Sequence, residues 1–292
     1  MAIQTAPAAS SESEAADCAR WLGKQEIVDE ILSPFPATAL RALLDHDLAD
    51  ESGKTVPPLG HWVYFLPIHR QSELADDGHV RRGGFWPPLP QPRRMFAGSR
   101  LSFVQPLRIG EAARRVGTIT NIQSKQGRSG LLTFVSVRQE IFGPDGLALT
   151  EEQDIVYRGA PGPEVTSAPS SPPSAIEQWG RDVMPDAAML FRYSALLFNA
   201  HRIHYDWPYA TEREGYPGLV VHGQLVATLL ADLARAETGS ELGSFEYRSV
   251  RAFVDGAHIR LSGHRDGDRV QLWATQSGQV GTLAEARLRP GT

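Results

Sequence analysis

The segment "LLFNAHRIHYDWPYA" holds the residues whose types could carry out acid–base chemistry. It places Asn199, His201, Arg202, His204 and Asp206 close together, directly after an apolar run. Because an imidazole titrates near neutral pH, His204 could accept a proton from water or from a carbon beside a carbonyl group. Asp206 could accept a proton, or it could cap the first free N–H groups of a helix. The segment is therefore either a catalytic loop or the polar junction between two elements.

A second segment, "GYPGLVVHGQL", could supply the complementary group. It turns at its Pro-Gly pair and enters "HGQLVATLLADLARAE", whose apolar residues recur at helical intervals on one face. The first N–H groups of such a helix are unpaired and carry about half a positive charge. Gly223 has no side chain to block access, so its N–H could stabilise an enolate oxygen. An imidazole facing this amide across one cavity would suit proton transfer beside a carbonyl.

The elements that must position these groups can be predicted from periodicity and turn signals. "EAADCARWLGKQEIVDEIL" and "PFPATALRALLDHD" both predict short helices, whereas 60–158 has the texture of an antiparallel meander. Its strand-like runs are "HWVYFLP", "RLSFVQPL", "RRVGTITNIQS", "GLLTFVSVRQEIF" and "LALTEEQDIVYR". Later, "AMLFRYSALLFN" predicts a strand or buried segment ending at Asn199, and a helix is expected over 222–236. Four more strand-like runs close the chain, with "RDGD" as a hairpin turn.

The composition along the chain predicts two domains of one plan. A stretch rich in Pro, Ser and Gly predicts an exposed linker over 161–185, between a first domain at 20–160 and a second at 186–292. Both halves contain an aromatic strand, a turn with Gly and a second strand, which favours a duplicated α+β fold. Only the second half has the histidine loop followed by a long helix. The Pro-rich aromatic loop "GGFWPPLPQPRRM" could form a pocket wall from the first half.

Together, "FNAHRIHYDWPYA" and "GYPGLVVHGQL" resemble the hydratase motif of the MaoC-like hot-dog family. That motif runs Gly-Asp-x-Asn-Pro-x-His-x-Asp, with a later Val-His-Gly that opens the central helix. Within the family, the sequence is most similar to the type 2 hydroxyacyl-thioester dehydratases, a group that includes mesaconyl-C4-CoA and itaconyl-CoA hydratases. The resemblance covers most of residues 20–292. It implies a double hot-dog fold, in which antiparallel sheets wrap a central helix and a degenerate N-terminal unit precedes the catalytic one.

The resemblance also implies roles for individual residues. His204 matches the catalytic His of the motif, Asp206 matches the Asp that follows it, and Gly223 matches the glycine of the oxyanion hole. The chain departs from the motif where Asn199 replaces the usual catalytic Asp. An amide can orient a water molecule but cannot accept its proton at neutral pH. Either His204 therefore carries the acid–base step alone or Asp206 shares it.

Other residues of the two segments are expected to contact the substrate. His201 and Arg202 occupy the positions of Asn and Pro in the motif, and Val221 and His222 precede the glycine as they do in the family. We expect Arg202 to pair with a substrate carboxylate, although a solvated arginine is an equally good interpretation. His222 could instead be packed and hydrogen-bonded beneath the helix.

The activity implied by the resemblance is reversible hydration of an enoyl-CoA and dehydration of a 3-hydroxyacyl-CoA. The preferred substrate would be a branched C5 dicarboxylyl-CoA of the itaconyl or mesaconyl type. No cofactor is expected, because coenzyme A is part of the substrate. Two alternatives are open: a hot-dog acyl-CoA thioesterase, and a non-catalytic acyl-CoA-binding protein.

Composition narrows the class of protein. The 292-residue chain has a formal net charge of −5, which disfavours nucleic-acid binding, and it has no apolar run long enough to cross a bilayer. One cysteine excludes a disulfide framework within the chain and a cysteine-based zinc cluster. The spacing His201-x-x-His204 is wrong for two metal ligands on a helix face, so no metal is expected. We expect a cytoplasmic homodimer or higher homo-oligomer that binds an acyl-CoA and neither nucleic acid nor membrane.

Overall fold

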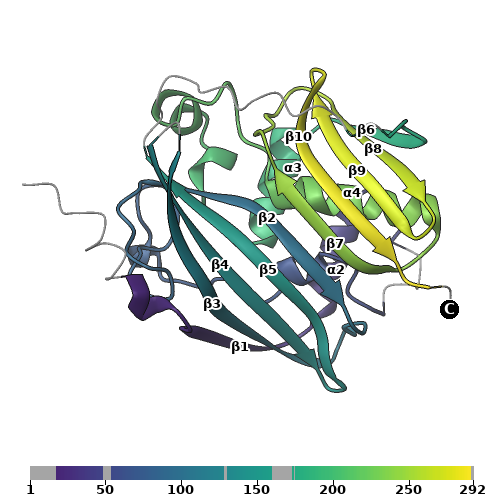
Figure 1. Cartoon of the computed structure of the whole chain (residues 1–292), viewed down its shortest axis with the longest axis horizontal. Coiled ribbons are helices and arrows are strands. Elements are labelled where there is room, and N and C mark those ends of the chain that lie inside the picture. Colours follow the sequence, from purple (N-terminus) through teal and green to yellow (C-terminus); the bar gives the residue numbers. More distant parts are fainter. Residues whose placement is uncertain (1–17, 49–53, 128–129, 160–172, 174, 291–292) are drawn as a thin grey trace, which may run out of the picture.

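The computed structural model describes residues 18–48, 54–127, 130–159, 173 and 175–290. Its strands form one ten-stranded antiparallel sheet in the order β1-β3-β4-β5-β2-β7-β10-β9-β8-β6 (Figure 1). The strands of the first half are β1 Gln25–Ile31, β2 Arg93–Phe103, β3 Ala112–Gly127, β4 Gly130–Gly143 and β5 Gly146–Arg158. Those of the second are β6 Trp179–Val183, β7 Leu242–Ser249, β8 Ile259–Asp266, β9 Arg269–Gln276 and β10 Gln279–Leu288.

The helices are few and lie mainly on one side of this sheet (Figure 1). The α-helices with described bounds are α2 Pro34–Leu43, α3 Ala187–Leu196 and α4 Gly223–Thr238. Short 3-10 turns occur at Ala19–Trp21, Gly60–Val63, Gln71–Glu73 and Arg202–His204, and a π-helical turn occurs at Tyr209–Arg213. Among the described residues, no helix has both the length and the apolar character needed to cross a bilayer.

Helix α4 forms the core of the second half. It packs against β7, β8, β9 and β10, which curve in front of it in Figure 1. The apolar residues that predicted this helix are all buried, namely Leu225, Val226, Leu229, Leu230 and Leu233. The helix ends at Gly239, whose φ of 62° suits a residue without a Cβ. The helix predicted over 222–236 is confirmed.

The first half is built differently. Its helix α2 makes its main contacts with α3 and with the turn Gly60–Val63 rather than with a strand. In the described part of the first half, no helix comparable to α4 packs along the sheet. One face of this part of the sheet is therefore free to line a cavity.

Strands β2 and β7 join the two halves into one sheet. They pair from Gly98 opposite Arg248 to Ser102 opposite Ser244. A Cβ added to Gly98 would lie 2.3 Å from the carbonyl oxygen of Tyr247, far inside van der Waals contact. The close approach of the two halves therefore requires glycine at this position.

Three predicted elements were wrong. The first expected helix contains β1 instead, because its alternating residues pair along β3. "HWVYFLP" forms a 3-10 turn at Gly60–Val63 rather than a strand. "AMLFRYSALLFN", expected as a strand or buried segment, is helix α3, whose start is capped by the Asp186 carboxylate accepting from the Met189 N–H at 2.7 Å.

The remaining predictions agree with the structure except at the linker. The other strand-like runs are confirmed as β2–β5 and β7–β10, and the second predicted helix is confirmed as α2. "RDGD" does join β8 to β9. The expected linker at 161–185 contains β6, which pairs with β8, while residues 161–172 and 174 lie outside the described part of the chain. The division into domains at 20–160 and 186–292 remains a proposal.

Candidate active site

A cavity of about 800 Å³ lies between the two halves. Loop 197–205 and the start of α4 line it from the second half, and β3, β4 and β5 line it from the first. Phe85 and Trp86 also line it, so the predicted pocket wall from "GGFWPPLPQPRRM" is confirmed. A space of this size, with apolar walls and a few polar groups, can take a small acyl thioester.

His204 lines this cavity in one defined tautomer. Its side chain is buried, and Nδ1 lies 2.7 Å from the carbonyl oxygen of Val220. A carbonyl can only accept, so Nδ1 carries the proton and the neutral ring keeps its lone pair on Nε2. Burial lowers the pKa of His204 to about 4, against the opposing effect of the Val220 hydrogen bond. At neutral pH, His204 is therefore an uncharged imidazole whose Nε2 can accept a proton.

His222 supports the ring of His204. The two rings stack with centroids 3.6 Å apart at an interplanar angle of 17°. His222 Nε2 shares a hydrogen bond of 2.9 Å with the hydroxyl of Ser194 on α3. Burial lowers the pKa of His222 as well, so two uncharged rings lie in contact. This placement matches the interpretation of His222 as a residue packed beneath the helix.

Gly223 lies immediately after His222 and begins α4 within the lining of the cavity. The N-cap residue His222 makes no side-chain hydrogen bond to the first turn, so the first N–H groups have no side-chain cap. A Cβ at Gly223 would lie 3.0 Å from the hydroxyl of Ser249, so a side chain would crowd this site. Val221 also lines the cavity, and its N–H donates to the carbonyl of Phe253 at 2.9 Å. The structure thus brings His204, Val221, His222 and Gly223 together.

Asn199 and His201, both in loop 197–205, also line the cavity. The carbonyl Oδ1 of Asn199 accepts from the N–H of His201 at 3.0 Å. The NH₂ group of Asn199 and the second lone pair of Oδ1 remain to orient a water molecule. The ring of His201 lies perpendicular to that of His204, with centroids 5.5 Å apart.

Arg202 and Asp206 do not line the cavity. Arg202 binds one oxygen of Asp206 through Nε at 2.8 Å and through a terminal nitrogen at 2.6 Å. The other oxygen of Asp206 accepts from the N–H of Tyr209 at 3.1 Å, and Arg202 also donates to the carbonyl of Asp76 at 3.0 Å. This geometry favours the capping role of Asp206 over a shared base role, and it gives no support to a contact of Arg202 with a substrate carboxylate. Their ion pair fixes the loop instead, and Asp206 caps the turn.

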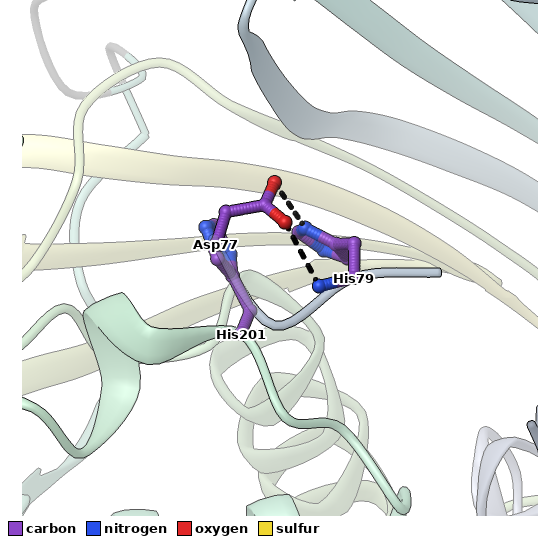
Figure 2. A group of neighbouring side chains, drawn as sticks. All are labelled: Asp77, His79 and His201. Carbon is purple, nitrogen blue, oxygen red and sulfur yellow. Dashed lines mark hydrogen bonds and ion pairs between the residues drawn. The ribbon is translucent and has the colours of Figure 1, made fainter. Parts of the chain in front are cut away.

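Asp77, His79 and His201 form a cluster (Figure 2), and two of its members, His79 and His201, also line the cavity. One potential ligand atom from each lies within 4.8 Å of the others, so these three could hold a divalent cation. However, the Asp77 carboxylate already accepts from His79 through Nδ1 at 3.0 Å and through the backbone N–H at 2.9 Å. Burial lowers the pKa of His79 to about 4 and also lowers that of His201, with the charge of Arg94 acting in the same direction. Asp77 and His79 are thus hydrogen-bonded to each other without an ion, and the nearby charge of Arg94 would oppose the binding of a cation.

The sequence analysis missed a buried carboxylate network in the first half. Glu151 is 1% exposed and accepts hydrogen bonds from His61, Trp62 and Ser99. Burial alone would raise the pKa of Glu151, but these hydrogen bonds outweigh it and lower the pKa, so the group is anionic. The sequence did contain an indication of this. Side chains alternate between the two faces of a strand, so Glu151 lies on the same face as the buried Leu149 and Ile155.

Comparison with known proteins agrees with this geometry. The family model described as hydroxyacyl-thioester dehydratase type 2 matches residues 59–255. Mesaconyl-C(4)-CoA hydratase of Chloroflexus aurantiacus is 51% identical, over 89% of this chain and 93% of its own. A MaoC-like dehydratase structure aligns with a TM-score of 0.70 at 15% identity, covering 92% of this chain and 98% of its own. A Mycobacterium tuberculosis protein with a double hotdog fold aligns with a TM-score of 0.53 at 14% identity, covering 91% and 96%.

The structural likenesses confirm the predicted α+β double hot-dog fold. The family match and the relative at 51% identity confirm the resemblance drawn from the two sequence segments. The chain belongs to the hydroxyacyl-thioester dehydratase type 2 family.

Proposed function

We propose that this protein is a hydro-lyase that reversibly hydrates an enoyl-CoA to a 3-hydroxyacyl-CoA. One observation carries the proposal. The uncharged ring of His204 stacks on His222, the residue immediately before the start of α4, and His204 and Gly223 line the same cavity. A base and an oxyanion site in that arrangement suit proton transfer beside a thioester carbonyl. The family to which the chain belongs supports the same reaction.

In the hydration direction, the NH₂ group of Asn199 would donate to the oxygen of the attacking water. His204 Nε2 would take a proton from this water as its oxygen bonds to Cβ. The π electrons of the double bond would move toward the thioester carbonyl, and the N–H of Gly223 would stabilise the enolate oxygen. His204 would then return the proton to Cα, on the face to which water added. Dehydration follows these steps in reverse, and no group beyond the substrate and the chain is consumed.

For the substrate, we propose a branched C5 dicarboxylyl-CoA of the mesaconyl or itaconyl type. A relative named for mesaconyl-C(4)-CoA shares 51% identity over most of both chains, which supports this choice. The polar lining contributed by the first half, with Gln139, Glu151 and Arg115, also suits an acyl group that is not purely apolar. We further propose that coenzyme A enters only as part of the substrate, that the protein acts in the cytoplasm, and that it assembles as a homodimer or higher homo-oligomer.

Replacement of His204 by Ala tests the proposed reaction. Turnover of crotonyl-CoA and mesaconyl-C4-CoA should fall by about 10²- to 10⁴-fold, because a general base contributes on that order. His258→Ala is the matched control, since this exposed histidine does not line the cavity and should leave turnover unchanged. The reaction is followed by loss of enoyl absorbance, with free thiol and the hydroxyacyl product measured in parallel.

The same assay separates the alternatives. Loss of enoyl absorbance without thiol release indicates hydration, whereas stoichiometric thiol release would show a thioesterase. A wild-type protein that binds both thioesters without turning over either would be a non-catalytic binder. Full turnover by His204→Ala would contradict the role of this residue.

A further inference from the structure

The concave face of the first-half sheet presents polar side chains to the cavity. Arg115 on β3, Gln139 on β4 and Glu151 on β5 all line it, and Gln139 lies directly opposite Glu151 in the strand register. In the second half, the corresponding face is covered by the apolar side of α4. Burying polar groups costs free energy unless they find partners. A polar inner face is therefore better suited to a polar ligand than to a dry core.

Glu151 uses its hydrogen-bonding capacity within the protein. Its two carboxylate oxygens accept from the indole N–H of Trp62, the hydroxyl of Ser99 and Nε2 of His61, the last at 2.9 Å. These contacts hold the His61 ring in place. Glu151 therefore positions His61 and has little capacity left for a substrate group.

The groups that surround Glu151 have unused hydrogen-bonding atoms. Nδ1 of His61 is buried and has no hydrogen-bond partner among the described residues, and the His61 side chain is 4% exposed. Within the same part of the chain, Nε of Arg115 and Oε1 of Gln139 are also buried without a partner. The amide nitrogen of Gln139 donates to Oε1 of Gln153 at 3.3 Å, so a flip of both amides would keep this hydrogen bond and turn a donor of Gln139 to the unpartnered position. Three unsatisfied groups thus gather around one satisfied carboxylate.

This cluster lies close to the proposed oxyanion site. Ser99, which donates to Glu151, is directly opposite Tyr247 across the β2–β7 junction. Ser249 is on the same face of β7, two residues along, and its hydroxyl lies beside Gly223. Trp62 contacts Tyr247 with ring centroids 6.1 Å apart. An acyl group whose carbonyl lies at Gly223 would share one cavity with His61.

We propose that His61, with Arg115 and Gln139, binds the free carboxylate of the acyl group, so that the first half selects dicarboxylyl thioesters. The substrate carboxylate would lie at Nδ1, on the side of the His61 ring opposite to Glu151 at Nε2. The Nε–H of Arg115 and the amide of Gln139 would supply further donors. This inference rests on the proposed function, because it assumes that the acyl group of a thioester occupies this cavity.

Saturated thioesters test the inference without turnover. Succinyl-CoA carries a carboxylate on Cβ, where butyryl-CoA carries a methyl group, and neither can be hydrated. Isothermal titration calorimetry should show that the wild-type protein binds succinyl-CoA at least about tenfold more tightly, as expected for hydrogen bonds to a charged group. His61→Gln keeps a donor for Glu151 and removes the second ring nitrogen. It should reduce the preference to about twofold or less and leave the affinity for butyryl-CoA unchanged.

Two further variants keep the test decisive. His258→Gln makes the same substitution at an exposed histidine outside the cavity lining and should retain the wild-type preference. Gln139→Leu should lose the preference selectively, and it serves as the test if His61→Gln does not fold by circular dichroism. The inference would be overturned if the wild-type protein bound succinyl-CoA and butyryl-CoA equally tightly. It would also be overturned if the folded His61→Gln variant lost affinity equally for both ligands.

The outcome is distinguishable from failure of the proposed function. A protein that hydrates crotonyl-CoA but shows no preference for succinyl-CoA keeps the hydratase proposal and loses the carboxylate site. A protein that shows a preference dependent on His61 but hydrates no enoyl-CoA keeps the binding site and loses the hydratase proposal.

Discussion

His204 can act as a base at neutral pH because its surroundings hold it in one protonation state. The Val220 carbonyl fixes the proton on Nδ1, burial disfavours the charged ring, and His222 supports it from one face. A cationic ring would also be repelled by a charged His79, which is buried nearby. Nε2 of His204 is therefore available to accept a proton without a carboxylate partner, and Asn199 stands where the motif has Asp.

This environment predicts an unusual pH profile. Because the pKa of His204 is lowered to about 4, the ring stays neutral as pH falls and gains a proton only near that value. The kcat/KM for hydration of crotonyl-CoA should be flat through the neutral range and should fall only as pH approaches about 4. Circular dichroism at each pH controls for acid unfolding. A fall centred at about 6.5, the ordinary value for histidine, would contradict this account.

At the residue scale, the sequence predicts the groups that lie in short motifs. The histidine loop and the Val-His-Gly segment identified His204 and Gly223, and the structure places both in one cavity. The network of His61 and Glu151 was missed because its members are far apart in the chain and meet only through sheet pairing and a 3-10 turn. The role of Arg202 was left open between a substrate contact and a solvated side chain, because a loop sequence does not show which way its side chain points.

At the scale of elements, residues of the first half hold loop 197–205 in place. Asp77 accepts the N–H of Arg202 through its backbone carbonyl at 2.9 Å. A Cβ at Gly78 would lie 1.8 Å from the carbonyl oxygen of Ala200, so this turn and the catalytic loop are in close backbone contact. The position of His204 therefore depends on a loop of the first half as well as on its own segment.

The junction of β2 and β7 gives a prediction about stability. Gly98→Ala would place a Cβ 2.3 Å from the Tyr247 carbonyl oxygen, so the strands must shift. We expect the free energy of unfolding to fall by about 1–3 kcal/mol, as for overpacking. Gly243→Ala on β7 is the control, because its Cβ would meet its nearest neighbour at an ordinary 3.6 Å and should change stability by no more than about 0.5 kcal/mol. Urea unfolding measures both, and equal effects would show that the contact does not matter.

Periodicity predicted the elements whose two faces differ. Helix α4 and strands β7–β10 have a clear buried face, and the sequence placed them correctly. It failed for β1 and α3, whose short apolar patterns fit both a helix and a strand, so pairing with β3 and a cap at Asp186 decided the outcome. No local signal shows that Gly60–Val63 turns as a 3-10 helix, because its side chains are held by the distant Glu151.

At the scale of the whole molecule, the groups proposed for proton transfer and those proposed to select the acyl group lie in different halves. The base and the proposed oxyanion site come from the second half, whereas the polar inner face and the aromatic wall come from the first. The absence of a helix like α4 from the described part of the first half leaves room for this division. Substitutions on β3, β4 and β5 should therefore alter the choice of acyl group more than the rate of the chemical step.

The cluster of Asp77, His79 and His201 allows a test for metal dependence. Because Asp77 already accepts two hydrogen bonds from His79, we expect dialysis against EDTA to leave hydratase activity and thermal stability unchanged. Activity lost on dialysis and restored by added zinc would show instead that these residues bind a functional ion. Asp77→Asn separates the two cases, since it weakens metal affinity while an amide oxygen can still accept from His79.

The continuous ladder across β2 and β7 also limits how this chain could be divided. If the halves were expressed as separate polypeptides, each would present the unpaired N–H and C=O groups of an edge strand to solvent. Such edges recruit other strands, so the isolated pieces would tend to aggregate rather than act as interchangeable modules. Variation of this enzyme is thus better sought by changing side chains within an intact chain than by exchanging its halves.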